Sequence, residues 1–122
     1  MLLLSHPLGN TFFRAAARAF HSAGWLQELD SCICWDSDSA FSSILPASFA
    51  VQLGRRTFRD VPLSLQHSHY WRELGRLLTS SFPFSWLQRH EQGPFSIDAV
   101  FHSFDRHVAS RLHNQNGLQA VY

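Results

Sequence analysis

The 122-residue sequence contains no lysine, and its formal net charge is only +1, from ten arginines against nine acidic residues. So small a charge gives no bulk electrostatic attraction to nucleic acid or to an anionic membrane, and we expect no nucleic-acid partner. All fixed positive charge is guanidinium, which suits bidentate contacts to carboxylates and phosphates, although a GC-rich coding sequence gives the same bias. Eight histidines make the net charge sensitive to pH between about 5 and 7.

Long apolar runs and well-spaced cysteines are also lacking. No stretch approaches the roughly 18 apolar residues of a membrane-spanning helix, and Met1 is followed by too short an apolar run for a signal peptide. Cys32 and Cys34 are one residue apart in a predicted strand, where a disulfide is poorly held and a zinc site lacks its second ligand pair. We expect reduced thiols, no metal ion and a soluble protein of the cytoplasm. Redox or metal chemistry at the cysteines is the alternative.

The first nineteen residues form the pattern around which the rest is organised. A continuous apolar run at 1–5 predicts a strand buried on both faces, as in a parallel sheet. Pro7 and Gly9 make a turn, and a helical pattern begins after a capping residue, Asn10 or Thr11. The loop should then lie at the carboxyl end of the first strand, where the helix N-terminus offers unpaired N–H groups to an anion.

A second strand follows at about 29–35, after the helix closes at Gly24. The apolar side of the helix between the two strands should include Phe12 and Phe13, and Arg14 and Arg18 should lie on its other side. A right-handed crossover makes the two strands parallel, which brings Asp36 to the same sheet edge as the first loop. An acidic residue there suits a ribose or sugar hydroxyl; the alternative is that Asp36 or Asp38 caps a short helix at 39–45.

The rest of the chain predicts further helices and one more strand. Helical patterns cover 46–54, 70–78, 84–90 and 97–113, the last capped by Ser96, and an irregular stretch at 55–69 reads as a surface excursion that shapes a substrate pocket. Aromatic and arginine residues gather at 70–90; they fit either packing on their own domain or peripheral contact with the inner face of a membrane. We predict a third strand at 118–122. The expected fold class is α/β, an incomplete Rossmann-like, three-layer domain with a short parallel sheet.

Six segments of the chain also form an ordered set. They are Leu-Leu-Leu-Ser-His-Pro-x-Gly-Asn-Thr-Phe at 2–12, Trp-Asp-x-Asp-Ser at 35–39, Leu-Gly-Arg-Arg at 53–56, Trp-Arg-Glu-Leu-Gly-Arg-Leu-Leu at 71–78, Arg-His-Glu-x-Gly-Pro-Phe-Ser-Ile-Asp-Ala-Val at 89–100 and the terminal Ala-Val-Tyr. Together they resemble the amino-terminal part of bacterial family 4 glycosyltransferases, over essentially all of residues 1–122.

The resemblance implies a GT-B enzyme, in which two Rossmann-like domains face each other across a cleft. Residues 1–122 would be an amino-terminal fragment on the acceptor side, inactive alone, with the donor-binding domain and its paired glutamates absent. The partners would be a nucleotide-sugar donor and a sugar or lipid-linked acceptor, and transfer would need no metal or other cofactor.

The same resemblance assigns the first loop to the donor diphosphate. Gly9 would allow close backbone approach, Asn10 and Thr11 would donate hydrogen bonds, and His6 would make a polar contact. Family members often carry a Gly-Gly pair where this sequence has Pro-Leu-Gly. No catalytic residue is assigned.

Two other classes of protein are alternatives to a glycosyltransferase. A dinucleotide-binding oxidoreductase requires Gly-x-Gly-x-x-Gly after the first strand, and the single glycine of this loop argues against it. A non-catalytic α/β interaction or ligand-binding module remains the alternative, because sheets with uncovered edges tend to find partners.

Overall fold

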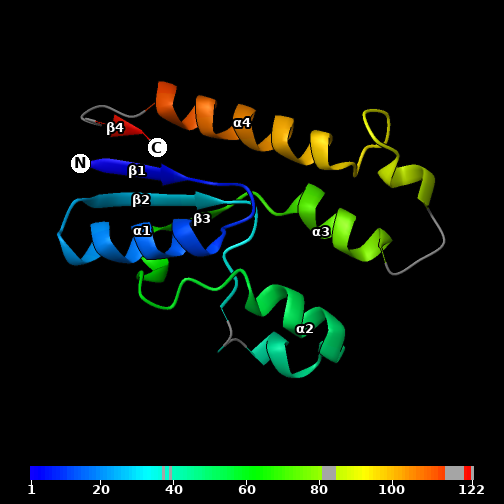
Figure 1. Cartoon of the computed structure of the whole chain (residues 1–122), viewed down its shortest axis with the longest axis horizontal. Coiled ribbons are helices and arrows are strands. Elements are labelled where there is room, and N and C mark those ends of the chain that lie inside the picture. Colours follow the sequence, from blue (N-terminus) through cyan, green and yellow to red (C-terminus); the bar gives the residue numbers. More distant parts are fainter. Residues whose placement is uncertain (37, 39, 81–84, 115–119, 122) are drawn as a thin grey trace.

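The protein is an α/β domain built on a short, wholly parallel sheet. The computed structural model describes residues 1–36, 38, 40–80, 85–114 and 120–121. Four strands lie in the order β3-β2-β1-β4: β1 (Leu2–Ser5), β2 (Leu26–Ser31), β3 (Gln66–Ser68) and β4 (Ala120–Val121). Helices α1 (Thr11–Ser22) and α4 (Ile97–His113) lie on opposite sides of the sheet, which gives three layers (Figure 1). The predicted class, a short Rossmann-like domain, is confirmed.

The β1–α1–β2 unit forms as the sequence predicts. Asn10 caps α1, because its side-chain Oδ1 accepts a hydrogen bond of 2.8 Å from the Phe13 N–H. Gly24 follows the helix with a φ of +71°, the left-handed conformation that ends many helices. The chain then returns as β2, which pairs in parallel with β1 and places Leu4 beside Leu29.

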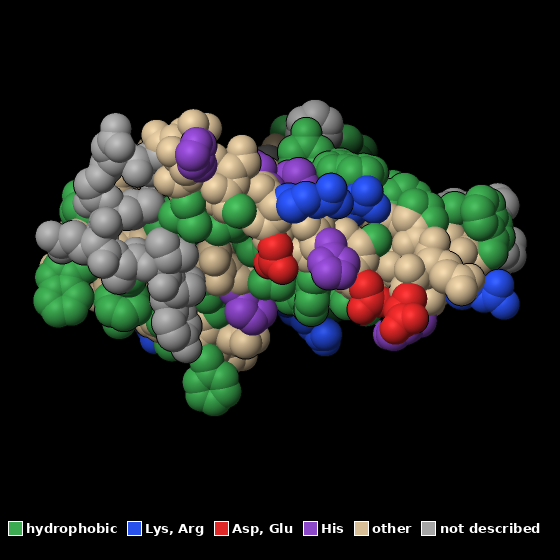
Figure 2. All heavy atoms as spheres, turned by 90° about the horizontal axis from the view of Figure 1, so that it is seen from above, with side chains coloured by type: hydrophobic (Ala, Val, Ile, Leu, Met, Phe, Trp, Pro, Cys, Tyr) green, Lys and Arg blue, Asp and Glu red, His purple; other side chains and the backbone are tan. Residues whose placement is uncertain are grey.

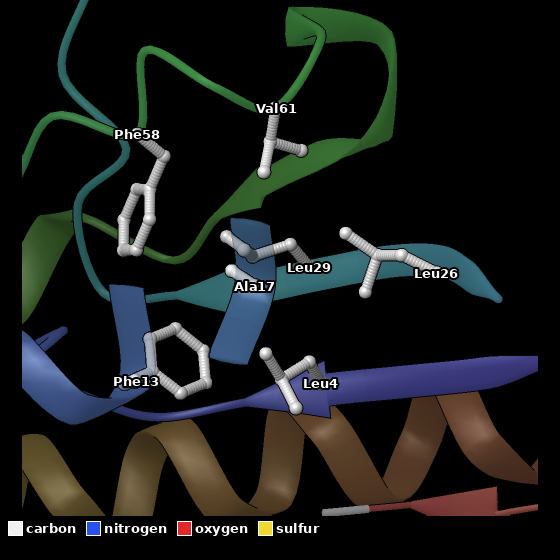
Figure 3. Packing of buried hydrophobic residues seen from close by; sticks show 7 residues of the cluster. All are labelled: Leu4, Phe13, Ala17, Leu26, Leu29, Phe58 and Val61. Atoms are coloured by element: carbon white, nitrogen blue, oxygen red, sulfur yellow. The ribbon is translucent and has the colours of Figure 1, made fainter. Parts of the chain in front are cut away.

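One apolar layer fills the space between the sheet and α1. Its buried residues come from both strands, the helix and the segment before β3 (Figure 3): Leu4, Phe13, Ala17, Leu26, Leu29, Phe58 and Val61. The rings of Phe13 and Phe58 meet edge to face, with centroids 5.7 Å apart. Each buried Leu or Phe side chain contributes about 1.5–3 kcal/mol of transfer free energy, so this layer holds α1 firmly against the sheet.

The opposite face of the sheet packs against α4. Leu3 and Cys32 meet Val100, Phe104 and Val108 there. The helix begins where the sequence predicts, since the Ser96 Oγ accepts a hydrogen bond of 3.2 Å from the Ala99 N–H. The outer face of the molecule on the α4 side mixes arginine, acidic, histidine and apolar side chains without a large field of one sign (Figure 2).

The limits of the strands differ from those predicted. The second strand was predicted at 29–35 and lies at Leu26–Ser31, because the backbone leaves the sheet at Cys32, whose N–H donates to the Pro7 carbonyl. Strand β3 falls in the stretch predicted to be a surface excursion. The strand predicted at 118–122 is found as Ala120–Val121, and its other three positions lie outside the described residues.

Shorter elements gather beyond the carboxyl end of the sheet (Figure 1). They are the 3-10 turns η1 (Ala40–Ser43) and η3 (Ser85–Gln88) and the helices α2 (Ala47–Gly54) and α3 (Trp71–Thr79), whereas the 3-10 turn η2 (Leu63–Leu65) directly precedes β3 at the other end of the sheet. A third apolar cluster of Ile33, Leu53 and Leu77 joins α2 and α3 to the chain that leaves β2. The end of α2 is thereby brought next to the start of α1.

Candidate functional site

The loop between β1 and α1 is held in shape by His6. The His6 Nδ1 accepts hydrogen bonds from the backbone N–H groups of Leu8 and Gly9, at 3.1 and 2.9 Å. An imidazole nitrogen that accepts two hydrogen bonds carries no proton, so we assign the ring proton to Nε2. Burial lowers the pKa of His6, which favours this neutral form. His6 therefore acts first as the internal support of the loop.

Gly9 is required where it stands. Its φ is +59°, and a Cβ atom at this position would lie only 2.7 Å from the Cζ of Phe58. Phe58 is only 4% exposed and cannot move away freely. The loop consequently lies directly on the aromatic core.

The first turn of α1 presents a favourable electrostatic environment for an anion. The Thr11 and Phe12 N–H groups precede the first intrahelical hydrogen bonds and point out of the helix end. No acidic residue occupies this first turn, so the positive end of the helix dipole is not neutralised within the helix. Next to it, the Asn10 Nδ2 lies 3.3 Å from the His6 Nε2. With the assigned tautomer both are N–H donors, and two such neighbours suit a shared acceptor.

A cavity of about 860 Å³ opens at this helix end, between α1 and α2. Gly9, Asn10 and Thr11 form one wall, and the opposite side carries three arginines, Arg14, Arg55 and Arg56. The lining, as far as the structure describes the chain, includes no carboxylate. We call this cavity the anion pocket.

Hydrogen bonds orient two of the three arginines. The Arg14 Nη1 donates to the Arg55 carbonyl at 2.9 Å, and the Arg56 Nη1 donates to the Gln52 carbonyl at 2.7 Å, both at the carboxyl end of α2. Arg56 also pairs through Nη2 with the buried Glu73 carboxylate of α3 at 2.6 Å. Its charge is thus compensated inside the protein, and the half-buried Arg14 and the exposed Arg55 are the other two cations of the pocket.

The structure separates the residues that the sequence assigned to one site. Gly9, Asn10 and Thr11 line the anion pocket, whereas His6 supports the loop from behind. Asp36 lies in a different cavity, and its Oδ1 accepts a hydrogen bond of 3.0 Å from the Asp38 N–H. This is a local turn contact rather than the cap of a helix, since the next turn begins at Ala40.

A second group of polar side chains lies between the sheet and α4. The His69 and His107 rings stack with centroids 4.5 Å apart, and the His69 Nε2 lies 2.8 Å from the Ser103 Oγ. Burial lowers the pKa of both histidines. Nearby, Arg111 pairs with Asp30 at 2.5 Å and with Glu28. Burial outweighs this pairing and raises the pKa of Asp30.

Neither thiol is poised for nucleophilic or metal chemistry. Cys32 and Cys34 are both free, and burial raises the pKa of Cys32 to about 12 and that of Cys34 to about 11. Across the described ranges no group of three or more His, Cys, Asp and Glu side chains could hold a metal ion. In the same part of the chain, no helix has the length and apolar character needed to cross a bilayer.

Comparison with known proteins leaves the site to be interpreted from its own geometry. No protein-family model, no curated protein and no solved structure matches the chain significantly. The feature that sequence reasoning missed is the arginine side of the anion pocket. Arg14 was assigned to an outer helix face, and Arg55 and Arg56 to a surface excursion; only the Leu-Gly-Arg-Arg segment at 53–56 signalled that two of them end a helix.

Proposed function

We propose that this domain is the amino-terminal, acceptor-side wall of a GT-B glycosyltransferase, and that its anion pocket receives the diphosphate of a nucleotide-sugar donor. One observation carries the proposal: the N-terminus of α1 and the side chains of Arg14 and Arg55 open onto the same cavity. Glycosyl transfer from a nucleotide-sugar requires stabilisation of a departing diphosphate. Helix N–H groups and guanidinium groups supply that stabilisation without a metal.

The position of the pocket supports the same proposal. It lies beyond the carboxyl end of β1, where parallel α/β sheets bind their ligands. The lining offers a diphosphate both helix-end donors and guanidinium forks, but its described residues include no aromatic side chain on which a nucleobase would stack. We therefore expect the domain to bind the diphosphate, with the nucleoside and the sugar contacted by a second domain.

Ligand titration followed by ¹⁵N NMR tests the binding step. Pyrophosphate and UDP-glucose should shift the amide signals of residues 9–14 with similar, millimolar dissociation constants, and uridine should shift none of them. Arg55→Gln should weaken both by about three- to tenfold, because one charge-assisted hydrogen bond is lost. Arg106→Gln on α4 is the matched control and should leave both unchanged.

Several results of this titration would contradict the proposed diphosphate site, and they can be told apart from one another. Equal shifts with uridine, or micromolar affinity that depends on the nucleoside, would show a complete nucleotide site and contradict the division between two domains. Chloride competing as well as pyrophosphate would show a nonspecific cationic surface.

Glycosyl transfer is measured on the protein purified from its natural host, as acceptor-dependent release of nucleoside diphosphate from nucleotide-sugars. We expect release with a sugar or lipid-linked acceptor, and loss of most of it in the Arg55→Gln variant. Diphosphate binding without any such release would favour the alternative, a non-catalytic α/β ligand-binding module.

A further inference from the structure

Two stacked histidines join α4 to the segment that follows β3. His69 lies between β3 and α3, and His107 lies on α4. Their ring centroids are 4.5 Å apart, and the ring planes differ by 20°. The His69 Nε2 also lies 2.8 Å from the Oγ of Ser103, which is one turn before His107 on α4. We call the stacked pair of His69 and His107 the histidine contact.

Positive groups surround the histidine contact from three elements. Arg72 of α3 is the cation beside His69. Arg111 of α4 and His67 of β3 lie beside His107. Burial, and after it these charges, lowers the pKa of both stacked histidines, so both rings are neutral at pH 7. A proton on either ring would place a new cation against the other ring and against its positive neighbours.

Two carboxylates of β2 face the same side of the sheet and pair with Arg111. They belong to Asp30, at 2.5 Å, and to Glu28. Asp30 also lies close enough to His67 to interact with its charge. Burial raises the pKa of Asp30, so its protonation favours the folded state and opposes any acid effect of the histidines. The effect of the histidines is therefore best observed above the pH range in which carboxylates titrate.

Helix α4 packs on the sheet through an apolar layer of its own. Leu3 and Cys32 meet Val100, Phe104 and Val108 there, and none of these residues belongs to the layer beneath α1. The two helices cover opposite faces of the sheet (Figure 1). Movement of α4 away from the sheet would therefore leave the packing of α1 in place.

We propose that the histidine contact is a pH-sensitive latch, which holds α4 on the sheet near neutral pH and releases it under mildly acidic conditions. Both rings are half-buried, so protons reach them without unfolding of the chain. In the closed state an added proton meets like charges and incomplete hydration, whereas water solvates it in the open state. The inference goes beyond the proposed function, because it depends on no diphosphate and on no transfer reaction.

Thermodynamic linkage gives the sign and the size of the effect. A histidine whose pKa is lowered in the closed state takes up a proton when α4 opens. The opening constant then rises by up to about tenfold per pH unit for each proton taken up. This rise begins as the pH falls below about 6.5, the ordinary pKa of histidine.

Hydrogen exchange at pH 7.5 and pH 5.5 tests the latch. Each exchange rate is divided into the rate of an unstructured chain at the same pH, which gives a protection factor. Protection of residues 101–112 of α4 should fall at least about tenfold between the two pH values, because a helix removed from its partner surface loses most of its stability. Protection of residues 15–22 of α1 should change less than about twofold, as expected for local opening.

Histidine variants examine the assignment to His69 and His107. Glutamine at both positions should abolish the fall in protection, and the single variants His69→Gln and His107→Gln should each retain about half of its logarithm. His102→Gln removes an exposed histidine from the same helix; it is the matched control and should leave the fall unchanged. The single variants decide the question if the double variant does not fold.

Three results would overturn the proposal. Equal loss of protection in α1 and α4 would show acid unfolding of the whole domain instead of a latch. Protection of α4 that is the same at both pH values would show that the stacked rings take up no proton on opening. A fall that the single and double variants leave undiminished would assign the acid response to other groups.

Discussion

Substitution of Gly9 by alanine should destabilise the protein through two separable effects. The first is conformational, because φ at Gly9 is +59° and an L-residue in this region costs about 1–2 kcal/mol. The second is steric, because the new Cβ would lie 2.7 Å from the Phe58 Cζ. Overpacking of a filled core costs about 1–3 kcal/mol. We therefore expect Gly9→Ala to lower the free energy of unfolding by about 2–5 kcal/mol.

Gly24 offers a matched control for the conformational effect alone. Its φ is +71°, and a Cβ atom there would meet nothing within 4 Å. Gly24→Ala should cost only about 1–2 kcal/mol. The entropy that alanine removes from the unfolded chain is similar at both positions and cancels in the comparison. Urea unfolding followed by tryptophan fluorescence would measure both variants.

A double-mutant cycle isolates the contact with Phe58. In a Phe58→Leu background the ring tip is gone, so Gly9→Ala should cost no more than Gly24→Ala does in the natural protein. Equal costs for Gly9→Ala and Gly24→Ala in the natural background would refute the claim that the loop lies against the aromatic core. A cost at Gly9 that Phe58→Leu leaves unchanged would refute it too.

Three further predictions concern buried polar groups. Glu73→Ala should cost about 3–5 kcal/mol in urea unfolding because it leaves two half-buried guanidinium groups without their buried carboxylate partner, whereas Asp60→Ala, at an exposed ion pair of 3.9 Å, should cost less than about 1 kcal/mol. Burial lowers the folded-state pKa of His69 and His107, so the unfolded chain binds more protons; stability should fall as pH drops below about 6.5, and this slope should weaken in a variant with glutamine at both positions. Since burial raises the pKa of Cys32 to about 12, Ellman's reagent at pH 8 should label it only after unfolding, and rapid labelling of the native protein would contradict this.

Local signals predicted the helices well, because they depend on residues that are neighbours in sequence. The limits of α4 follow from the cap at Ser96 and from the helical period, and both match the structure. Sidedness was less accurate. Phe12 was expected to pack against the sheet and is 87% exposed. Whether a residue at the border of an apolar helix face is buried depends on the surface that packs against the helix, and the helical period alone does not show that surface.

The sequence did not predict the edge strand β3, for a different reason. Strand β3 is three residues long and polar, Gln66–Ser68, so it has neither apolar alternation nor a run of β-branched residues. The segment forms a strand because its backbone pairs in parallel with that of β2 at Leu29 and Asp30. Its pairing also places Gln66 at the cavity that Asp36 lines.

The anion pocket shows the same division between local and distant information. Gly9, Asn10 and Thr11 were predicted from one loop, but Arg14 and Arg55 are 41 residues apart and meet only because α2 ends next to the start of α1. The positive end of α1 and the negative end of α2 thus face the same space. The Arg55 carbonyl at the end of α2 accepts a hydrogen bond from the guanidinium of Arg14, so the Arg14 side chain is held in place before any anion arrives. Such preorganisation lowers the entropic cost of binding a diphosphate between the two helix ends.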